Sequence, residues 1–201
     1  MNYTIYTRSR SEELYGKMLE FLPKEANIKP VTGFDGYYES VEYLLYIIND
    51  CQTDYIVNID EDCFIYDFSE VEKIISDLEK LKLTHAGMSD FGACPHRNFR
   101  QETHNPFFNV INAEFAKKTI MYDLLECEEF EPFDKLFYNM YKEGRHYHLG
   151  VKQYDEISTE LIHNKPFCIH TWYSRDYEID GFHKKRIIEA YEYAKSKQVW
   201  K

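Results

Sequence analysis

Long apolar runs are missing from this 201-residue sequence, and none approaches the roughly 18 residues that a membrane-spanning helix needs. The first five residues, Met1-Asn2-Tyr3-Thr4-Ile5, also lack the basic stretch and apolar core with which a secretory signal peptide begins. We therefore expect a soluble, unprocessed chain with no transmembrane segment.

Cysteine pairs are also missing. The five cysteines are scattered, odd in number and never spaced as Cys-x-x-Cys. This distribution argues against a disulfide framework and against a structural zinc site. It fits a reducing compartment, and we expect a cytoplasmic protein.

Positive charge is scarce as well. Lys and Arg number 24 against 35 Asp and Glu, which leaves a formal net charge of −11. Because the chain as a whole repels nucleic-acid phosphate, we expect no nucleic-acid partner. An anionic ligand has to be bound locally, by a metal ion or by a few well-placed cations.

The sequence does contain a regular alternation of apolar strands and amphipathic helices. Ser69 and Glu72 form a capping-box pattern at the start of one helix, and residues 87–106, which show no periodicity, read as a long loop. With no linker or repeat, the chain reads as a single domain, residues 1–201, with a mostly parallel central sheet in an α/β/α sandwich. The strands are predicted at 2–7, 28–32, 54–59, 83–86, 107–111 and 167–170, and the helices at 11–21, 38–49, 69–81, 113–125, 132–141, 154–162 and 177–197.

The most informative polar cluster, Asp60-Glu61-Asp62, directly follows the apolar strand 54–59. Alternate residues at a strand end can point to the same side, so Asp60 and Asp62 can share a divalent ion while Glu61 points elsewhere. Mg²⁺ and Mn²⁺ prefer such carboxylate oxygens, together with phosphate oxygens. The alternative is an acidic turn that simply ends a strand in solvent.

A second polar cluster follows the strand predicted at 167–170. Ligands of parallel sheets bind beyond the carboxyl ends of the strands, so His170 is expected to face the same crevice as Asp60. A neutral imidazole there can complete the coordination of Mn²⁺, and Arg175 can pair with a phosphate. The alternative for His170 is a hydrogen-bonded structural residue.

Together these segments resemble a known family. The strand 55–59 running into Asp60-Glu61-Asp62, preceded by the helix 38–49, is similar to the nucleotide-binding half of GT-A glycosyltransferases. Residues 108–112 resemble the strand of that family that reaches the acceptor side, and His170 matches its carboxy-terminal metal-binding histidine. The resemblance spans about residues 1–175 and implies a GT-A-like, Rossmann-like fold.

The resemblance also implies an activity. It implies a metal-dependent glycosyltransferase that moves a sugar from a UDP- or GDP-sugar to the hydroxyl of a glycan or another acceptor. Asp60, Asp62 and His170 would hold Mn²⁺ or Mg²⁺. Thr7, Arg8, Asp60 and Arg175 are the candidates for contacting the nucleotide donor, although an exposed arginine of an acidic protein is often only solvated.

An inverting transferase also needs a carboxylate base near the acceptor hydroxyl. The candidates are Asp155, Glu156 and Asp90, and Asp155 reads equally well as a helix N-cap. His146 and His148 alternate as His-x-His, which without a third ligand nearby predicts a surface strand rather than a metal site.

Two other functions remain open. The segment from Ile59 to Phe64 also resembles the nucleophile loop of haloacid-dehalogenase-type phosphatases and phosphotransferases, although that loop usually lies near the amino terminus. The chain also fits a non-catalytic module that binds a sugar or a nucleotide. The presence of Asp60, Asp62 and His170 together argues against that last alternative.

Overall fold

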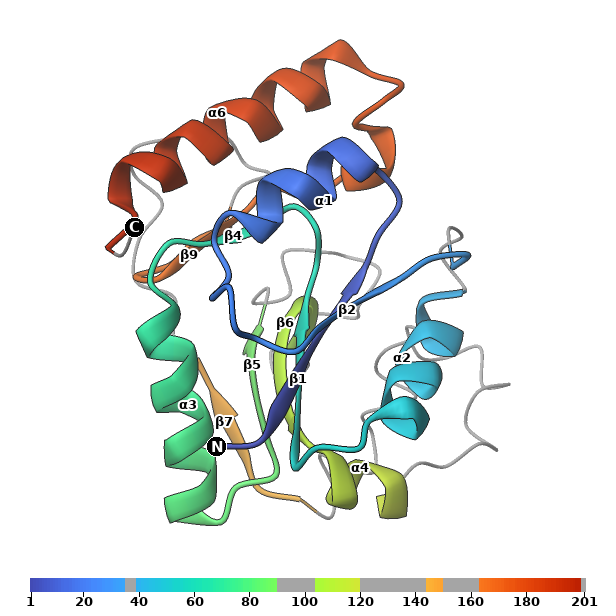
Figure 1. The fold of residues 1–201 in the computed structure, drawn as a ribbon, viewed down its shortest axis with the longest axis vertical. Coiled ribbons are helices and arrows are strands. Elements are labelled where there is room, and N and C mark those ends of the chain that lie inside the picture. Colours follow the sequence, from blue (N-terminus) through green and yellow to red (C-terminus); the bar gives the residue numbers. More distant parts are fainter. Residues whose placement is uncertain (35–38, 90–103, 120–143, 150–162, 200–201) are drawn as a thin grey trace.

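The computed structural model describes residues 1–34, 39–89, 104–119, 144–149 and 163–199. Figure 1 shows a twisted central sheet with helices on both sides and a smaller sheet above it. The predicted helices 132–141 and 154–162, and the end of the helix predicted at 113–125, lie outside the described residues. None of the described helices is long and apolar enough to cross a membrane.

The central sheet has six strands in the order β2-β1-β3-β6-β5-β7. Strand β1 pairs in parallel with β2 and β3, and β5 pairs in parallel with β7, so the predicted mostly parallel α/β sheet is confirmed. Strand β6 runs antiparallel between β3 and β5. The strands are β1 Tyr3–Arg8, β2 Ile28–Val31, β3 Tyr55–Ile59, β5 His85–Ser89, β6 His104–Asn112 and β7 His146–His148.

Helices cover both faces of this sheet, as the α/β/α prediction requires. Side chains of α1, α3 and α6 join one core cluster with Val57 and Val110, and those of α2 and α4 join the other with Ile56 and Ile111. The alternation of strand side chains between two apolar layers explains why β3 is buried at every position. The helices are α1 Glu12–Leu19, α2 Glu39–Asp50, α3 Phe68–Leu81, α4 Ala113–Thr119 and α6 Gly181–Lys197.

A second, three-stranded sheet was not predicted. It has the order β4-β9-β8, with β4 at Cys63–Ile65, β8 at His163–Asn164 and β9 at Cys168–His170. The placement of 167–170 in the central sheet was therefore wrong, because β9 pairs antiparallel with β4, with Cys63 opposite His170. Strand β4 has only three residues, too few to show a periodic pattern of its own.

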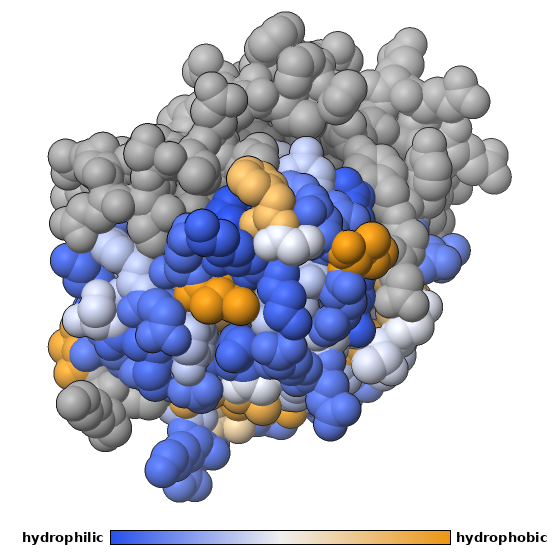
Figure 2. All heavy atoms as spheres, turned by 90° about the horizontal axis from the view of Figure 1, so that it is seen from above, coloured by the Kyte–Doolittle hydropathy of each residue, from blue (hydrophilic) through white to orange (hydrophobic). Residues whose placement is uncertain are grey.

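Two helix starts differ from the prediction. Asp67, and not Ser69, caps α3: its carboxylate accepts a hydrogen bond from the backbone N–H of Ser69 at 3.2 Å. Helix α6 begins at Gly181 because the Asp180 side chain caps it at the N–H of Phe182, after a short 3₁₀ turn at Ser174–Asp176. Figure 2 views the molecule from the end that carries α6. The part of this surface formed by described residues is largely hydrophilic, with separate apolar side chains.

The loop predicted at 87–106 is shorter than expected at both ends. Gly87 belongs to β5 and His104 already belongs to β6, whereas residues 90–103 lie outside the described part of the chain. The start of β6 was not predicted because it consists of polar residues, which usually indicate a loop. His104 and Asn105 are instead buried and hydrogen-bonded. The Asn105 side chain accepts from the N–H of Phe107, and its carbonyl accepts from the amide of Asn109.

Gly87 is required by this buried polar layer. An alanine Cβ at Gly87 would lie 2.5 Å from Nδ1 of His104 and 2.7 Å from Oδ1 of Asn109. We expect Gly87→Ala to lower the free energy of unfolding by about 1–3 kcal/mol, the usual cost of overpacking. The matched control is Gly16→Ala on the exposed side of α1, where nothing lies within 4 Å and a gain of roughly 0.5–1 kcal/mol is expected. Urea unfolding measures both, and a Gly87→Ala variant as stable as the wild type would contradict this account.

Candidate metal-binding site

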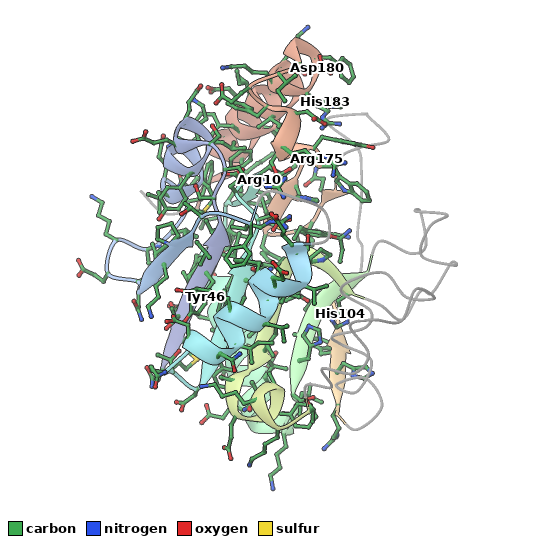
Figure 3. All side chains as sticks on the ribbon, turned by 90° about the vertical axis from the view of Figure 1, so that its right-hand side faces the viewer. Arg10, Tyr46, His104, Arg175, Asp180 and His183 are labelled. Carbon is green, nitrogen blue, oxygen red and sulfur yellow. The ribbon has the colours of Figure 1, made fainter. Side chains whose placement is uncertain are left out.

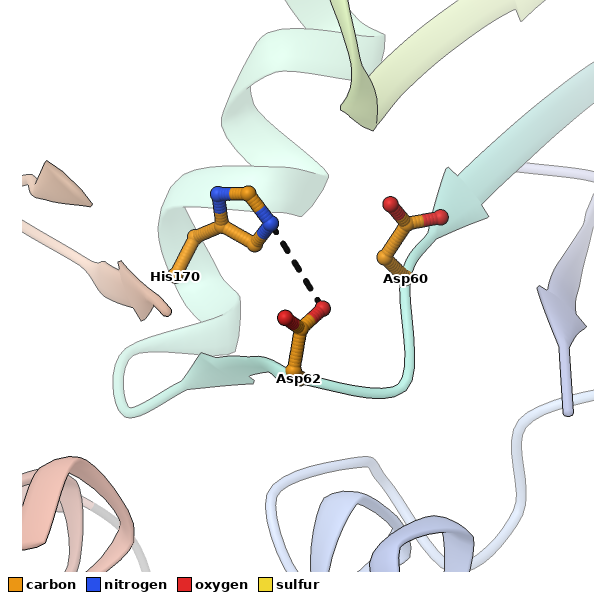
Figure 4. A group of neighbouring side chains, drawn as sticks. All are labelled: Asp60, Asp62 and His170. Atoms are coloured by element: carbon orange, nitrogen blue, oxygen red, sulfur yellow. Dashed lines mark ion pairs between the residues drawn. The ribbon is translucent and has the colours of Figure 1, made fainter. Parts of the chain in front are cut away.

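Three potential metal ligands meet where β3 ends. Asp60 and Asp62 lie on the turn between β3 and β4, and His170 ends β9 (Figure 4). Each offers one ligand atom, and these atoms all lie within 4.8 Å of one another. The predicted proximity of the three residues is confirmed, but the reason differs, since β4 pairs with β9 and carries His170 back to Asp62.

Asp62 is held in a defined orientation. It is 1% exposed, and its Oδ2 accepts a hydrogen bond from the Thr171 hydroxyl at 3.3 Å. Its Oδ1 lies 3.5 Å from Nε2 of His170 and has no hydrogen-bond partner among the described residues. Burial works to raise the pKa of Asp62, but the neighbouring His170 and Thr171 hold it below its ordinary value.

Asp60 is the more accessible carboxylate, half-buried where Asp62 and His170 are buried. Desolvation raises its pKa above the ordinary value, and the nearby charge of Asp62 adds to this, while Arg8 opposes it. A bound cation would relieve the repulsion that the charge of Asp62 exerts on Asp60.

This donor set fits a divalent ion. Two carboxylate oxygens and one imidazole nitrogen suit Mn²⁺, and the carboxylates alone suit Mg²⁺. The buried Oδ1 of Asp62 has only the distant Nε2 of His170, at 3.5 Å, near it within the described part of the chain, and a cation would satisfy this oxygen. Of the three residues only Asp60 is partly exposed, so a further ligand of the ion would approach from its side.

Phe107 supports the site from β6, and sequence reasoning missed it. Its ring stacks on the imidazole of His170 at a centroid distance of 4.1 Å and an angle of 5°. Its carbonyl accepts a hydrogen bond from the backbone N–H of Asp60 at 2.9 Å. One residue thus holds both a carboxylate ligand and the imidazole, and only the antiparallel placement of β6 brings it there.

Glu61 points away from the other two carboxylates, as predicted. Its Oε2 accepts hydrogen bonds from the backbone N–H groups of Arg10 and Ser11, at 3.0 and 3.2 Å. Burial raises the pKa of Glu61 to about 7, with the two backbone hydrogen bonds opposing this shift. Its role is to tie the start of α1 to the metal-site turn.

Two of the residues predicted to contact the donor, Thr7 and Arg8, lie beside this turn. The Thr7 hydroxyl is buried and donates to the carbonyl of Ile59, so it anchors the end of β3. Arg8 donates from Nη1 to the Ser40 hydroxyl at 2.6 Å, and its charge acts on Asp60. Arg175 is exposed and lies over the ring of Tyr173 at 5.4 Å. Figure 3 shows Arg10 and Arg175 at the same end of the molecule.

The three candidates for a catalytic base, Asp90, Asp155 and Glu156, lie outside the described residues. His146 and His148 do form a strand, β7, as predicted. His146 is half-buried, with its ring 6.4 Å from that of the buried His104, which in turn lies 4.4 Å from the ring of His85. Among the described residues, the only group of three or more potential ligands within bonding range of one ion is Asp60, Asp62 and His170.

Arg186 is a second residue that sequence reasoning missed. It is 3% exposed, on α6, and its Nη2 donates to the carbonyl of Trp172 at 2.6 Å. Burial lowers its pKa below the ordinary value, while the charge of Asp62 acts in the opposite direction. A signal was present: Arg186 stands four and eight residues before Ala190 and Ala194, on the buried stripe of the helix.

No family model matches the sequence, and no curated protein sequence matches it. The fold is similar to that of a glycosyltransferase involved in the glycosylation of the major capsid of PBCV-1. The TM-score is 0.52 and the identity 13%, over 93% of this chain and 98% of that one.

The fold is also similar to that of TarS from S. aureus. The match to TarS residues 1–349 has a TM-score of 0.53 and 11% identity, over 98% of this chain and 69% of that one. A longer TarS structure gives the same TM-score with 42% of its length covered. At such low identity these likenesses concern the fold, and they confirm the predicted GT-A-like α/β class.

Proposed function

We propose that this protein is a metal-dependent glycosyltransferase that transfers a sugar from a UDP- or GDP-sugar to an acceptor hydroxyl. The observation that carries the proposal is the meeting of Asp60, Asp62 and His170 at the carboxyl end of β3. Ligands of open α/β sheets bind at such strand ends. The similarity in fold to the PBCV-1 glycosyltransferase supports the same conclusion.

The proposed role of the metal ion follows from the charge of the donor. A bound Mn²⁺ or Mg²⁺ would neutralise the negative charge that grows on the leaving diphosphate. With a net charge of −11, the protein needs such a local device to hold an anionic donor at all. Asp60 and Asp62 supply the carboxylates, and His170, stacked on Phe107, is fixed in orientation before the ligand arrives.

We assign donor contacts to residues around the turn. Arg8 is placed by Ser40 and acts electrostatically on Asp60, so it would meet the donor beside the metal. Arg175 would meet it from the exposed rim, and Thr7 would act by holding β3 in position. Asp90, Asp155 or Glu156 would serve as base if the transfer is inverting.

A screen of donors tests the proposal. Thermal unfolding with a panel of UDP- and GDP-sugars, each with Mn²⁺ and with a chelator, should show stabilisation only when donor and metal are both present. Release of nucleoside diphosphate should then follow with a mixed glycan pool as acceptor. Phosphate release from simple phosphomonoesters would favour the dehalogenase-type alternative. Metal-dependent binding without any turnover would favour the non-catalytic module.

A reducing, cytoplasmic setting belongs to the same proposal. The three cysteines within the described part of the chain, Cys51, Cys63 and Cys168, are all free and buried. Activity should therefore be unchanged by a thiol reductant.

A further inference from the structure

Arg186 has N–H groups for which the described part of the chain supplies no acceptor. Its Nη2 is hydrogen-bonded to the Trp172 carbonyl, but its Nε and Nη1 are buried without a hydrogen-bond partner among the described residues. A guanidinium remains charged at all ordinary pH values and has no acceptor function. A buried cation that is not paired with a carboxylate lowers the stability of the folded state. Binding of an anion to these N–H groups would reduce that cost.

The position of Arg186 relates it to the metal site. Its hydrogen-bond acceptor, Trp172, lies two residues beyond His170, and the Trp172 ring is 6.0 Å from the imidazole. The charge of Asp62 acts on the guanidinium. Arg186 on α6 and Asp62 on the metal-site turn therefore interact electrostatically, although they come from different elements.

The turn that lies against Arg186 is strained. Trp172 and Tyr173 have φ values of 60° and 63°, in the left-handed region that residues other than glycine rarely adopt. Such strain persists only where surrounding contacts hold it, and it gathers at ligand sites. Arg186 supplies some of the contacts here, through the Trp172 carbonyl and a 5.9 Å approach to the Tyr173 ring, and His183 supplies another by stacking on Tyr173 at 4.8 Å. Both turn residues are half-buried and Arg186 is buried, so an anion can reach the guanidinium only if groups packed against it, this turn among them, move.

From these observations we infer that Arg186 is an anion-binding residue of the site, whose Nε and Nη1 take an oxygen of the donor's diphosphate when the Trp172–Tyr173 turn moves aside. The inference rests on the proposed function and deepens it. The metal at Asp60 and Asp62 and the guanidinium of Arg186 would divide the charge of the diphosphate between them. Arginine suits this task because its charge-assisted hydrogen bonds to phosphate are strong. Release of the backbone strain at Trp172 and Tyr173 would offset part of the free energy needed to move the turn.

The test compares Arg186→Gln with Lys185→Gln in the full chain. Lys185 is the neighbouring, exposed cation of α6, whose Nζ lies 3.7 Å from Glu189, and it has the same formal charge. Calorimetric titration with UDP, GDP and inorganic pyrophosphate in Mn²⁺ should show an affinity loss of about 10- to 100-fold in Arg186→Gln, the worth of a charged hydrogen bond. Lys185→Gln should bind like the wild type. The affinity for Mn²⁺ alone should be the same in all three proteins.

A role in folding alone would be recognised by other readouts. Arg186→Lys keeps the charge but loses the guanidinium donors, and it should recover part of the diphosphate affinity. If Arg186→Gln fails to fold, the comparison of Arg186→Lys with the wild type decides the question. In the wild type, Trp172 fluorescence should change on adding pyrophosphate with Mn²⁺, because the turn moves.

The outcomes separate this inference from the proposed function. Equal diphosphate affinity in wild type, Arg186→Gln and Arg186→Lys would overturn the inference, while metal-dependent nucleotide binding would leave the proposed function standing. Pyrophosphate binding that depends on Arg186, in a protein that binds no nucleotide, would support an anion site and reject the glycosyltransferase. A wild type that binds none of these anions would overturn both.

Discussion

Asp62→Asn should reduce the release of nucleoside diphosphate from a nucleotide sugar by about 100- to 1000-fold, the usual loss when one group that stabilises a leaving anion is removed. The substitution keeps the shape of the side chain and an oxygen that can accept the Thr171 hydroxyl. It removes the charge that binds a cation. The folded state should lose some stability, because His170 and Thr171 favour the charged form of Asp62, and the relief of Asp60 offsets only part of that loss.

The measurement is turnover of the best donor found in the screen, at saturating Mn²⁺, with calorimetric titration of UDP or GDP alongside. Asp60→Ala should behave in the same way as Asp62→Asn. Asp54→Asn is the matched control, since Asp54 is an exposed carboxylate just before β3. Nucleotide affinity that is equal in wild type and Asp62→Asn, or that a chelator leaves unchanged, would mean that binding does not use this metal site.

Phe107→Ala should cost the protein about 3–5 kcal/mol of unfolding free energy, the range for deleting a buried aromatic ring. Phe107 is fully buried, and its ring contacts His170 face to face. The backbone of Phe107 is also tied to the turn that carries the carboxylates, because its carbonyl accepts a hydrogen bond from the N–H of Asp60. A loss of this size is a large part of the stability of an ordinary domain.

A milder substitution separates stability from function. Phe107→Leu keeps most of the apolar volume but removes the flat surface that orients the imidazole, so the affinity for Mn²⁺ should fall more than the stability does. Phe108→Leu is the control: Phe108 is the next residue of β6 and equally buried, and its ring packs at 5.3 Å against Phe167. Urea unfolding and Mn²⁺ titration of both variants test this. Equal Mn²⁺ affinities would show that the stacking does not position His170.

Local sequence patterns predicted most of the elements because each pattern depends on neighbouring residues. The apolar run Tyr55–Ile59 is buried at every position, as a central strand should be, and the acidic turn follows it directly. Helix α2 lies within a residue of its predicted start and end. The errors came where polar residues are buried, as at His104 and Asn105, or where a strand is only three residues long, as in β4.

Some residues of the candidate site were likewise predictable from local sequence, and others were not. Asp60, Asp62 and His170 were predicted as metal ligands from their residue types and from the strands before them, and the structure brings them together. Phe107 and Arg186 were not predicted, because an apolar residue in a strand and a cation in a helix are ordinary locally. Their importance comes only from what they contact: His170 in one case, and the Trp172 turn in the other.

By itself, the sequence determined the alternation of strands and helices, the acidic turn at the end of β3 and the kinds of side chain available to a metal ion. Those features follow from periodicity and residue chemistry within a few positions. Only the tertiary structure decided that β9 leaves the central sheet to pair with β4, and that β6 runs antiparallel so that Phe107 reaches His170. These contacts join residues far apart in the chain, and their stability comes from burying both partners together, which no local pattern records.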